Sequence, residues 1–237
     1  MRSTHTPPEL GPGHRVGPFE LLCPVARGGM AEVWLGRLRG PGAFEREVAL
    51  KTPHMRLLAE EDAYAMLFDE ARLSASLTHP NLLAVHQLLE DDVGRPFLVM
   101  DYIEGVQLAT LQEHGALAPA IALRIAYDVL LGLDAAHSLK QRDGTPANLV
   151  HRDVSPQNVI VGSDGYARLG DFGIACAEER VTRTHTGVMK GRLAYMSPER
   201  LMGRDVDLRT DVFGVGVILW EALTGQRLFG ARSDWDV

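Results

Sequence analysis

The feature that most constrains this 237-residue chain is a short polar segment set between strongly apolar ones. Residues 151–158 read HRDVSPQN. They follow an apolar stretch, residues 121–139, that has helical spacing and begins just after Pro119, a residue favoured at the start of a helix. They precede two short predicted strands, residues 159–161 and 166–169, which turn at Ser-Asp-Gly. The segment is therefore predicted to be a rigid loop between buried elements.

Two side chains of this loop suggest chemistry. Asp153 can accept a proton from a hydroxyl group, and Asn158, five residues later, can offer an amide oxygen to a metal ion. With each residue type at about 5% frequency, four matching positions arise by chance roughly once in 10⁵ placements. An ordinary polar turn is a poor explanation of such a segment.

Further motifs follow in a fixed order. Asp171-Phe172-Gly173 begins 13 residues after Asn158, at the end of the second short strand. A carboxylate there, with a glycine two positions on, suits a Mg²⁺ ligand on a movable loop. Ser197-Pro198-Glu199 comes later, and Asp211 lies at the start of an apolar segment, residues 210–223, that predicts a buried helix.

The first hundred residues have a different character. Their alternation and turn residues predict mostly strands, with one helix, whereas helical spacing dominates from residue 108. We therefore expect two lobes joined near residues 101–105, and ligands favour clefts between lobes. The strands are predicted at residues 19–25, 32–38, 47–51, 82–89 and 96–100, and the helix at residues 60–77.

A glycine turn lies between the first two strands. Its low side-chain bulk would let backbone N–H groups lie over phosphates, although the same residues would also suit an ordinary hairpin. It departs from the G-x-G-x-x-G pattern, because Ala26 and Ala31 replace the outer glycines. The turn reads Ala26-Arg27-Gly28-Gly29-Met30-Ala31-Glu32-Val33.

Lys51 closes the apolar strand at residues 47–51. Such a lysine either buries its aliphatic chain and keeps its ammonium group in water, or binds phosphates in a cleft. The second role needs a carboxylate to orient the ammonium group. Glu70, 19 residues later on the predicted helix, is the candidate.

Taken in order, these motifs resemble the signature series of protein kinase domains. HRDVSPQN and the Gly-Gly-Met turn resemble the bacterial serine/threonine, or Hanks-type, branch, and the resemblance runs from about residue 17 to the end. It implies an α+β bilobal fold: a small antiparallel sheet with one helix in residues 17–101, and a mainly helical lobe in residues 102–237. Residues 1–16, rich in Pro, Gly and His, are predicted to be a flexible leader.

The resemblance also assigns roles at the site. Lys51, held by Glu70, would contact the α- and β-phosphates of ATP, and Asp153 would deprotonate the acceptor hydroxyl. Asn158 and Asp171 would hold Mg²⁺, which Mn²⁺ could replace. Further ATP-binding residues would be those of the glycine turn and the adenine pocket: Val25, Ala26, Arg27, Gly28, Gly29, Met30, Ala31, Glu32, Val33, Ala49, Met100, Asp101 and Ile103.

Regulatory and structural roles are implied as well. Arg152 would pair with a phosphate on Thr184 or Thr186 of the loop after Asp171, and ordering of that loop would follow. His151, Phe172, Glu199 and Asp211 would be structural, with Asp211 accepting backbone N–H groups of the catalytic loop. The family's partner of Glu199 is an arginine in a later region. Because the sequence stops at Val237, we expect the last helices to be missing and Glu199 to be an unpaired buried charge.

The function implied is transfer of the ATP γ-phosphoryl group to Ser or Thr hydroxyls of proteins. No tyrosine lies between Asp171 and Ala194, but Ser155 stands where most serine/threonine kinases carry a lysine. Two alternatives stay open. One is a nucleotide-binding or docking module without turnover, favoured by the altered glycine turn and the early end. The other is a small-molecule phosphotransferase.

Composition limits the partners and the location. A net charge of −7 makes bulk nucleic-acid binding a poor expectation. Cys23 and Cys176 lie far apart, without metal-ligand spacing, which predicts free thiols in a reducing cytoplasm. There is no signal peptide, and the longest apolar run is too short to span a bilayer. We expect a cytoplasmic domain, with a membrane anchor beyond the end of the chain left open.

Overall fold

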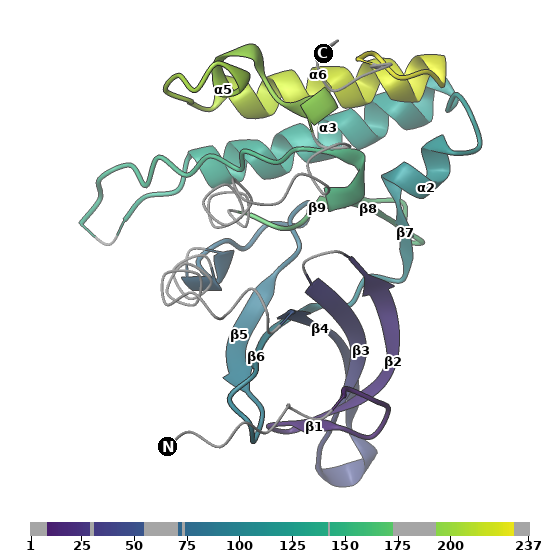
Figure 1. The fold of residues 1–237 in the computed structure, drawn as a ribbon, viewed down its shortest axis with the longest axis vertical. Helices are drawn as coiled ribbons and strands as arrows, with labels where there is room; N and C mark the ends of the chain where they lie inside the picture. Colours follow the sequence, from purple (N-terminus) through teal and green to yellow (C-terminus); the bar gives the residue numbers. More distant parts are fainter. Residues whose placement is uncertain are drawn as a thin grey trace. The chain divides into compact units, whose positions relative to one another are not determined.

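The computed structural model describes residues 9–28, 31–54, 71–72, 74–141, 143–172 and 193–229. It divides into two compact units (Figure 1). The first takes in residues 1–71 and 85–102, and the second takes in residues 72–84 and 103–237. The predicted lobe boundary at residue 101 lies next to this division. Residues 72–84 differ from the prediction, since they pack with the second unit.

The first unit is built on a six-stranded antiparallel sheet in the order β1-β2-β3-β4-β6-β5, which is strongly curved in Figure 1. The five predicted strands are all present, each with ends shifted by a few residues. A short 3₁₀ turn, η1 (Pro41–Ala43), joins β3 to β4. The strands are β1 (Arg15–Val16), β2 (Phe19–Arg27), β3 (Ala31–Arg39), β4 (Glu45–Pro53), β5 (Val85–Glu90) and β6 (Pro96–Asp101).

One face of this sheet forms the core of the first unit. Trp34 on β3, Leu50 on β4 and Val99 on β6 are fully buried there, and aligned pairing places them on the same side. Side chains alternate between the two faces of a strand, so the neighbouring positions point to the opposite face. That opposite face carries Lys51.

The predicted flexible leader is partly wrong, because residues 9–16 belong to the first unit. Val16 is fully buried and pairs with Phe19 across β1 and β2. The Gly13 N–H donates to the carbonyl of Leu21 at 2.8 Å, and His14 Nε2 lies 3.2 Å from Asp91 Oδ2. The Pro, Gly and His content suggested disorder, but a buried valine, a backbone hydrogen bond and a side-chain contact hold this stretch against the sheet. Residues 1–8 lie outside the described residues.

The second unit holds a three-stranded antiparallel sheet, β7-β8-β9, beside its helices. The two long predicted helices and the predicted strand pair are present, whereas the short β7 and α2 have too few residues for a periodic signal. The elements are β7 (Gly105–Gln107), α2 (Leu108–Gln112), α3 (Pro119–His137), η3 (Pro156–Asn158), β8 (Val159–Gly162), β9 (Ala167–Leu169), η5 (Leu193–Tyr195), α5 (Pro198–Leu201) and α6 (Arg209–Thr224).

The long helices α3 and α6 run side by side and enclose the core of the second unit (Figure 1). Leu133 of α3 and Ile218 of α6 are both fully buried in it, together with Leu169 of β9. Pro119 occupies the first turn of α3, and Gly225 ends α6 in the left-handed conformation, with φ of 65°. The loop that carries Asp153 and Asn158 lies against this core.

Two sequence predictions, the helix at residues 60–77 and the lack of a membrane-spanning segment, can be compared only with the described residues. The predicted helix at residues 60–77 falls mostly outside them, although Ala71, Arg72 and Ser74 are helical. In the ranges that the structure describes, no helix combines the length and the apolar character needed to cross a bilayer.

Candidate active site

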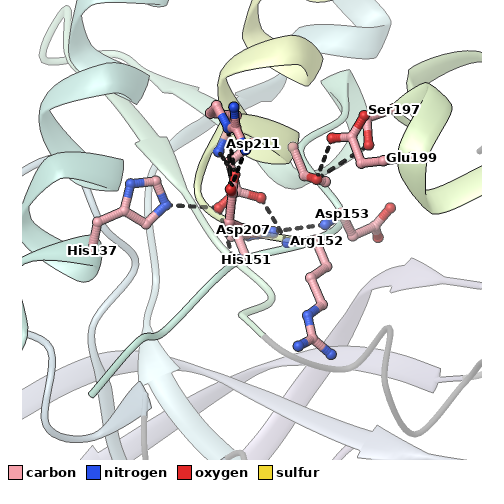
Figure 2. Close-up of polar contacts among 10 residues, drawn as sticks. His137, His151, Arg152, Asp153, Ser197, Glu199, Asp207 and Asp211 are labelled. Atoms are coloured by element: carbon pink, nitrogen blue, oxygen red, sulfur yellow. Dashed lines mark hydrogen bonds and ion pairs between the residues drawn. The ribbon is translucent and has the colours of Figure 1, made fainter. Parts of the chain in front are cut away.

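The candidate site of the second unit is organised around the carboxylate of Asp211, in the first turn of α6 (Figure 2). Its Oδ1 accepts the backbone N–H of Arg152 at 2.7 Å, and its Oδ2 accepts the backbone N–H of His151 at 2.8 Å. His137, the last residue of α3, also donates from Nε2 to Oδ2 at 2.8 Å. The Asp211 side chain is 0% exposed, so these donors replace the water that a charged group requires.

The next turn of α6 lets the same loop approach closely. A Cβ atom added at Gly214 would lie 2.8 Å from the carbonyl oxygen of Val154. A side chain there would therefore push the loop away from the helix. Asp211 and Gly214, three residues apart on one face of α6, together fix the backbone of residues 151–154.

His151 joins this loop to the segment that precedes Asp171. The imidazole is fully buried, and its Nε2–H donates to the carbonyl of Gly170 at 2.8 Å while Nδ1 accepts the backbone N–H of Asp153 at 3.2 Å. Its ring lies 4.5 Å from the ring of Phe172, centroid to centroid. The flanks of Asp171 are thus held against the catalytic loop.

Arg152 and Asp171 both have backbone conformations that side chains disfavour. Their φ angles are 68° and 62°, in the left-handed region. Each such residue costs on the order of 1–3 kcal/mol and persists only where its surroundings hold it. Asp211 holds the N–H of Arg152, and the N–H of Gly170 donates to the carbonyl of Asn158 at 2.9 Å. Ala43 and Asn148 share this conformation elsewhere in the described residues, so the two motifs that carry the predicted chemistry hold part of the backbone strain.

Asn158 is oriented by Asp153. Its Nδ2 donates to the carbonyl of Asp153 at 2.7 Å and to Asp153 Oδ2 at 2.8 Å. Because the amide nitrogen is engaged twice, the amide oxygen is the atom of this side chain that can serve a cation. This orientation fits the predicted role as a metal ligand.

The donor set suits a metal that arrives with its substrate. Mg²⁺ prefers oxygen ligands and is commonly bound through one or two protein side chains plus phosphate oxygens. Asn158 and Asp171 would supply such oxygens. Within the described ranges, no group of three or more His, Cys, Asp or Glu side chains is placed so that it could hold a metal ion.

Two buried polar side chains fix the strand that leads to Asp171. Asp128 on α3 accepts the N–H of Ala167 at 2.9 Å, and Asn81 Nδ2 donates to the carbonyl of the same residue at 3.0 Å. The Leu169 N–H also donates to the carbonyl of Asn81 at 2.9 Å. Residues 72–84 therefore help to place the end of β9.

The first unit gathers four of the predicted ATP-binding side chains on one sheet face. Lys51 lies opposite Val33 on β3 and opposite Leu98 on β6, while Ala49 lies opposite Met100. Directly opposed residues of antiparallel strands point to the same face. This face is the reverse of the one that carries Trp34 and Leu50.

Other predicted nucleotide contacts lie at the ends of strands. Val25, Ala26 and Arg27 end β2, and Ala31 and Glu32 begin β3 after a turn closed by the Gly28 N–H, which donates to the Ala31 carbonyl at 2.9 Å. The predicted junction of the lobes, near residues 101–105, falls at the division of the units. Asp101 ends β6, and Ile103 begins the second unit. Gly29, Met30, Glu70, Thr184 and Thr186 lie outside the described residues.

Glu199 differs from the sequence-based expectation of a buried, unpaired charge. It is only half-buried, and its Oε1 accepts the hydroxyl of Thr210 at 2.8 Å. Its pKa is lowered, chiefly by its own backbone N–H at the start of α5 and then by the hydroxyls of Thr210 and Ser197. Neutral hydrogen-bond donors and partial exposure stabilise this carboxylate.

Sequence reasoning missed two features of the site. The contact of His137 with Asp211 joins residues 74 apart, and a histidine at a helix end carries no signal for such a partner. Ser155 is 1% exposed, and its hydroxyl has no hydrogen-bond partner in the part of the chain that the structure describes. The position of Ser155 was noticed in the sequence, but its burial was not.

Comparison with known proteins defines the class. Residues 20–236 match the model of the protein kinase domain family, so the chain belongs to that family. The crystal structure of the PknI kinase domain of Mycobacterium tuberculosis resembles this fold with a TM-score of 0.71 and 28% identity, over 95% of this chain and 81% of that one. The predicted family and α+β kinase fold are confirmed.

Curated relatives place the chain among bacterial kinases. The tyrosine-protein kinase MasK of Myxococcus xanthus is 41% identical over 224 residues, 92% of this chain and 34% of that protein. The serine/threonine-protein kinase PknL of Mycobacterium tuberculosis is 39% identical over 211 residues, 88% of this chain and 50% of that protein. The chain thus spans between a third and a half of the length of these relatives.

Replacing Asp211 by alanine should loosen the catalytic loop. Each buried backbone N–H left without an acceptor, at His151 and Arg152, costs about 1–3 kcal/mol. We expect a lower urea midpoint of unfolding and faster hydrogen exchange of these two amides. Asp207→Ala is the matched control, because that carboxylate is exposed and contacts Arg209. Equal effects of the two substitutions would contradict this account of Asp211.

Proposed function

We propose that this chain is an ATP-dependent serine/threonine protein kinase domain that transfers the γ-phosphoryl group of Mg·ATP to protein hydroxyls. The observation that carries the proposal is the fixed relation of Asp153 and Asn158. They are hydrogen-bonded to each other, on a loop whose backbone is held by buried Asp211. A general base and a metal ligand in one rigid loop are the parts that phosphoryl transfer requires.

The proposed chemistry is mostly positioning. Bound Mg·ATP supplies the phosphoryl group and part of the charge compensation. Asp153 orients the acceptor hydroxyl and takes its proton as the oxygen attacks in line. Lys51, oriented by Glu70, binds the α- and β-phosphates, and Val33, Ala49 and Met100 contact the adenine.

Mg²⁺ is the proposed metal. The ligands are a carboxylate and an amide oxygen, which are hard donors that suit Mg²⁺. Mn²⁺ accepts the same ligands and could replace it. Both are supported by the family and by the orientation of the Asn158 amide.

The relatives differ in the acceptor hydroxyl for which they are named. Two relatives, PknL and the probable kinase PknB of Lactococcus lactis, are named as serine/threonine kinases, whereas MasK is named as a tyrosine kinase. Ser155 replaces the lysine usual in serine/threonine kinases. Thr182, Thr184 and Thr186, with no tyrosine in residues 172–193, favour Ser/Thr chemistry in this chain.

We also propose that Arg152 binds a phosphate on Thr184 or Thr186. Its backbone is held by Asp211, so the guanidinium extends from a fixed point beside the catalytic Asp153. A phosphate adds charge close to −2 and strong acceptor oxygens that pair well with arginine. Such a pair would order the loop after Asp171.

Partners and location follow from the same proposal. ATP and Ser/Thr-containing proteins are the proposed partners, and the net charge of −7 gives no support to nucleic-acid binding. A cytoplasmic location is proposed because the reaction consumes ATP and the two cysteines lack the pattern of a disulfide framework.

Replacing Asp153 by asparagine tests the reaction. Loss of a general base typically lowers turnover by about 10²–10⁴-fold. We expect that loss in phosphate transfer from Mg·ATP to a generic basic protein, with ATP binding retained. Asp143→Asn, on an exposed turn, should retain full activity. A wild-type chain that binds ATP but transfers no phosphate would instead be the binding module without turnover.

Mapping of phosphate after incubation with Mg·ATP tests the acceptor class and the regulation together. We expect phosphothreonine at residues 182–186 and a slower reaction with tyrosine peptides than with threonine peptides of the same sequence. Arg152→Ala should retain the ability to bind ATP but lose the gain in activity that follows the modification. Phosphate found on tyrosine alone would contradict the serine/threonine assignment.

A further inference from the structure

A histidine outside every predicted role contacts the glycine turn. His54 follows β4 directly, three residues after Lys51, and its Nε2 lies 2.9 Å from the carbonyl oxygen of Gly28. The donor in this contact is the Nε2–H of the imidazole. The Gly28 N–H already closes the turn through the Ala31 carbonyl, so both backbone polar groups of Gly28 have partners.

The imidazole is itself positioned from the core. Its Nδ1 lies 3.9 Å from Oε1 of Glu32, and the other oxygen of Glu32 accepts the indole N–H of Trp34 at 3.2 Å. Trp34 is 1% exposed and belongs to the core of the first unit. A series of contacts therefore runs from a buried tryptophan through Glu32 and His54 to the backbone of the turn.

These contacts lie on the side of the sheet away from Lys51. Glu32 and Trp34 are two residues apart on β3 and share a face. Val33, between them, pairs with Lys51 and points to the opposite face. His54 can thus hold the Gly28 carbonyl without occupying the face that carries Val33 and Lys51. Glu32, another predicted ATP-binding residue, lies on the same side as His54.

We propose that His54 is a positioning residue for the nucleotide: it holds the Gly28 carbonyl and so fixes the backbone that directly follows β2, where the turn proposed to receive the phosphates begins. The inference rests on the proposed function, since it assumes that this turn binds ATP. Ordering a glycine-rich backbone costs conformational entropy, and a contact already made in the free protein lowers that cost on binding. Ala26 and Ala31, which stand in place of the outer glycines at the ends of the two strands, also limit the conformational freedom of the backbone.

The expected effect is on ATP affinity. The contact involves a backbone carbonyl and none of the reacting atoms, so its loss should weaken binding with kcat little changed. One hydrogen bond of ordinary net strength corresponds to about a 2- to 12-fold change in affinity. Glutamine places an amide N–H near the position of the imidazole Nε2–H, so His54→Gln should restore most of the affinity that His54→Ala loses.

The test is calorimetric titration of Mg·ATP into the 237-residue chain carrying Asp153→Asn, which removes turnover. His54→Ala and His54→Gln are added to that background. His114→Ala is the control, because His114 also contacts a backbone carbonyl, that of Thr110 at 3.0 Å, in the second unit. We expect weaker binding for His54→Ala alone.

The outcomes separate the two proposals. If the parent binds no ATP, the proposed function fails and this inference fails with it. If the parent binds ATP and His54→Ala binds it equally well, this inference alone is overturned. A loss that His54→Gln does not restore, or that His114→Ala shares, would also overturn it, because the hydrogen-bond donor would then not be the cause.

Discussion

A single buried carboxylate, that of Asp211, holds the backbone on which the candidate site depends. It receives two successive backbone N–H groups and the imidazole of His137, and its side chain is 0% exposed. A charge so placed is tolerated only while all of its donors stay in position. The carboxylate depends on the hydrogen-bond donors of the loop, and the backbone conformation of the loop depends on the carboxylate.

The hydrogen bonds around Asp211 also explain how the site keeps two strained backbone conformations. Arg152 and Asp171 both adopt left-handed conformations, and both lie next to groups held by His151, Asp211 or Asn158. The hydrogen bonds fix side chains at the points where a proton and a metal would be handled. In the first unit, strand pairing positions the side chains, because it places Val33, Ala49 and Lys51 on one face of the sheet. Rigid positioning is what phosphoryl transfer chiefly requires of a protein.

Periodicity predicted the long helices, because α3 and α6 each bury one face, and alternation together with turn residues predicted the strands β2 to β6. It could not predict β7 or α2, which are too short to show a period, or the order of residues 9–16, which depends on burial of Val16. Motif spacing predicted which side chains belong to the candidate site, and the structure joins two of them, Asp153 and Asn158, by a hydrogen bond. The contact of His137 with Asp211 and that of His54 with Gly28 depend on tertiary placement, and no local pattern indicates them. Glu199 was expected to be buried, but the structure leaves it half-exposed.

The central claim is that Asn158 and Asp171 serve as oxygen ligands for the metal of Mg·ATP. Titration of ATP into the chain with Mg²⁺ and with EDTA measures this claim directly. The account predicts that Mg²⁺ strengthens binding in the unaltered chain, and that Asp171→Asn removes most of this gain while Asp164→Asn, on the exposed turn before β9, retains it. A gain from Mg²⁺ that is the same in all three proteins would contradict the account.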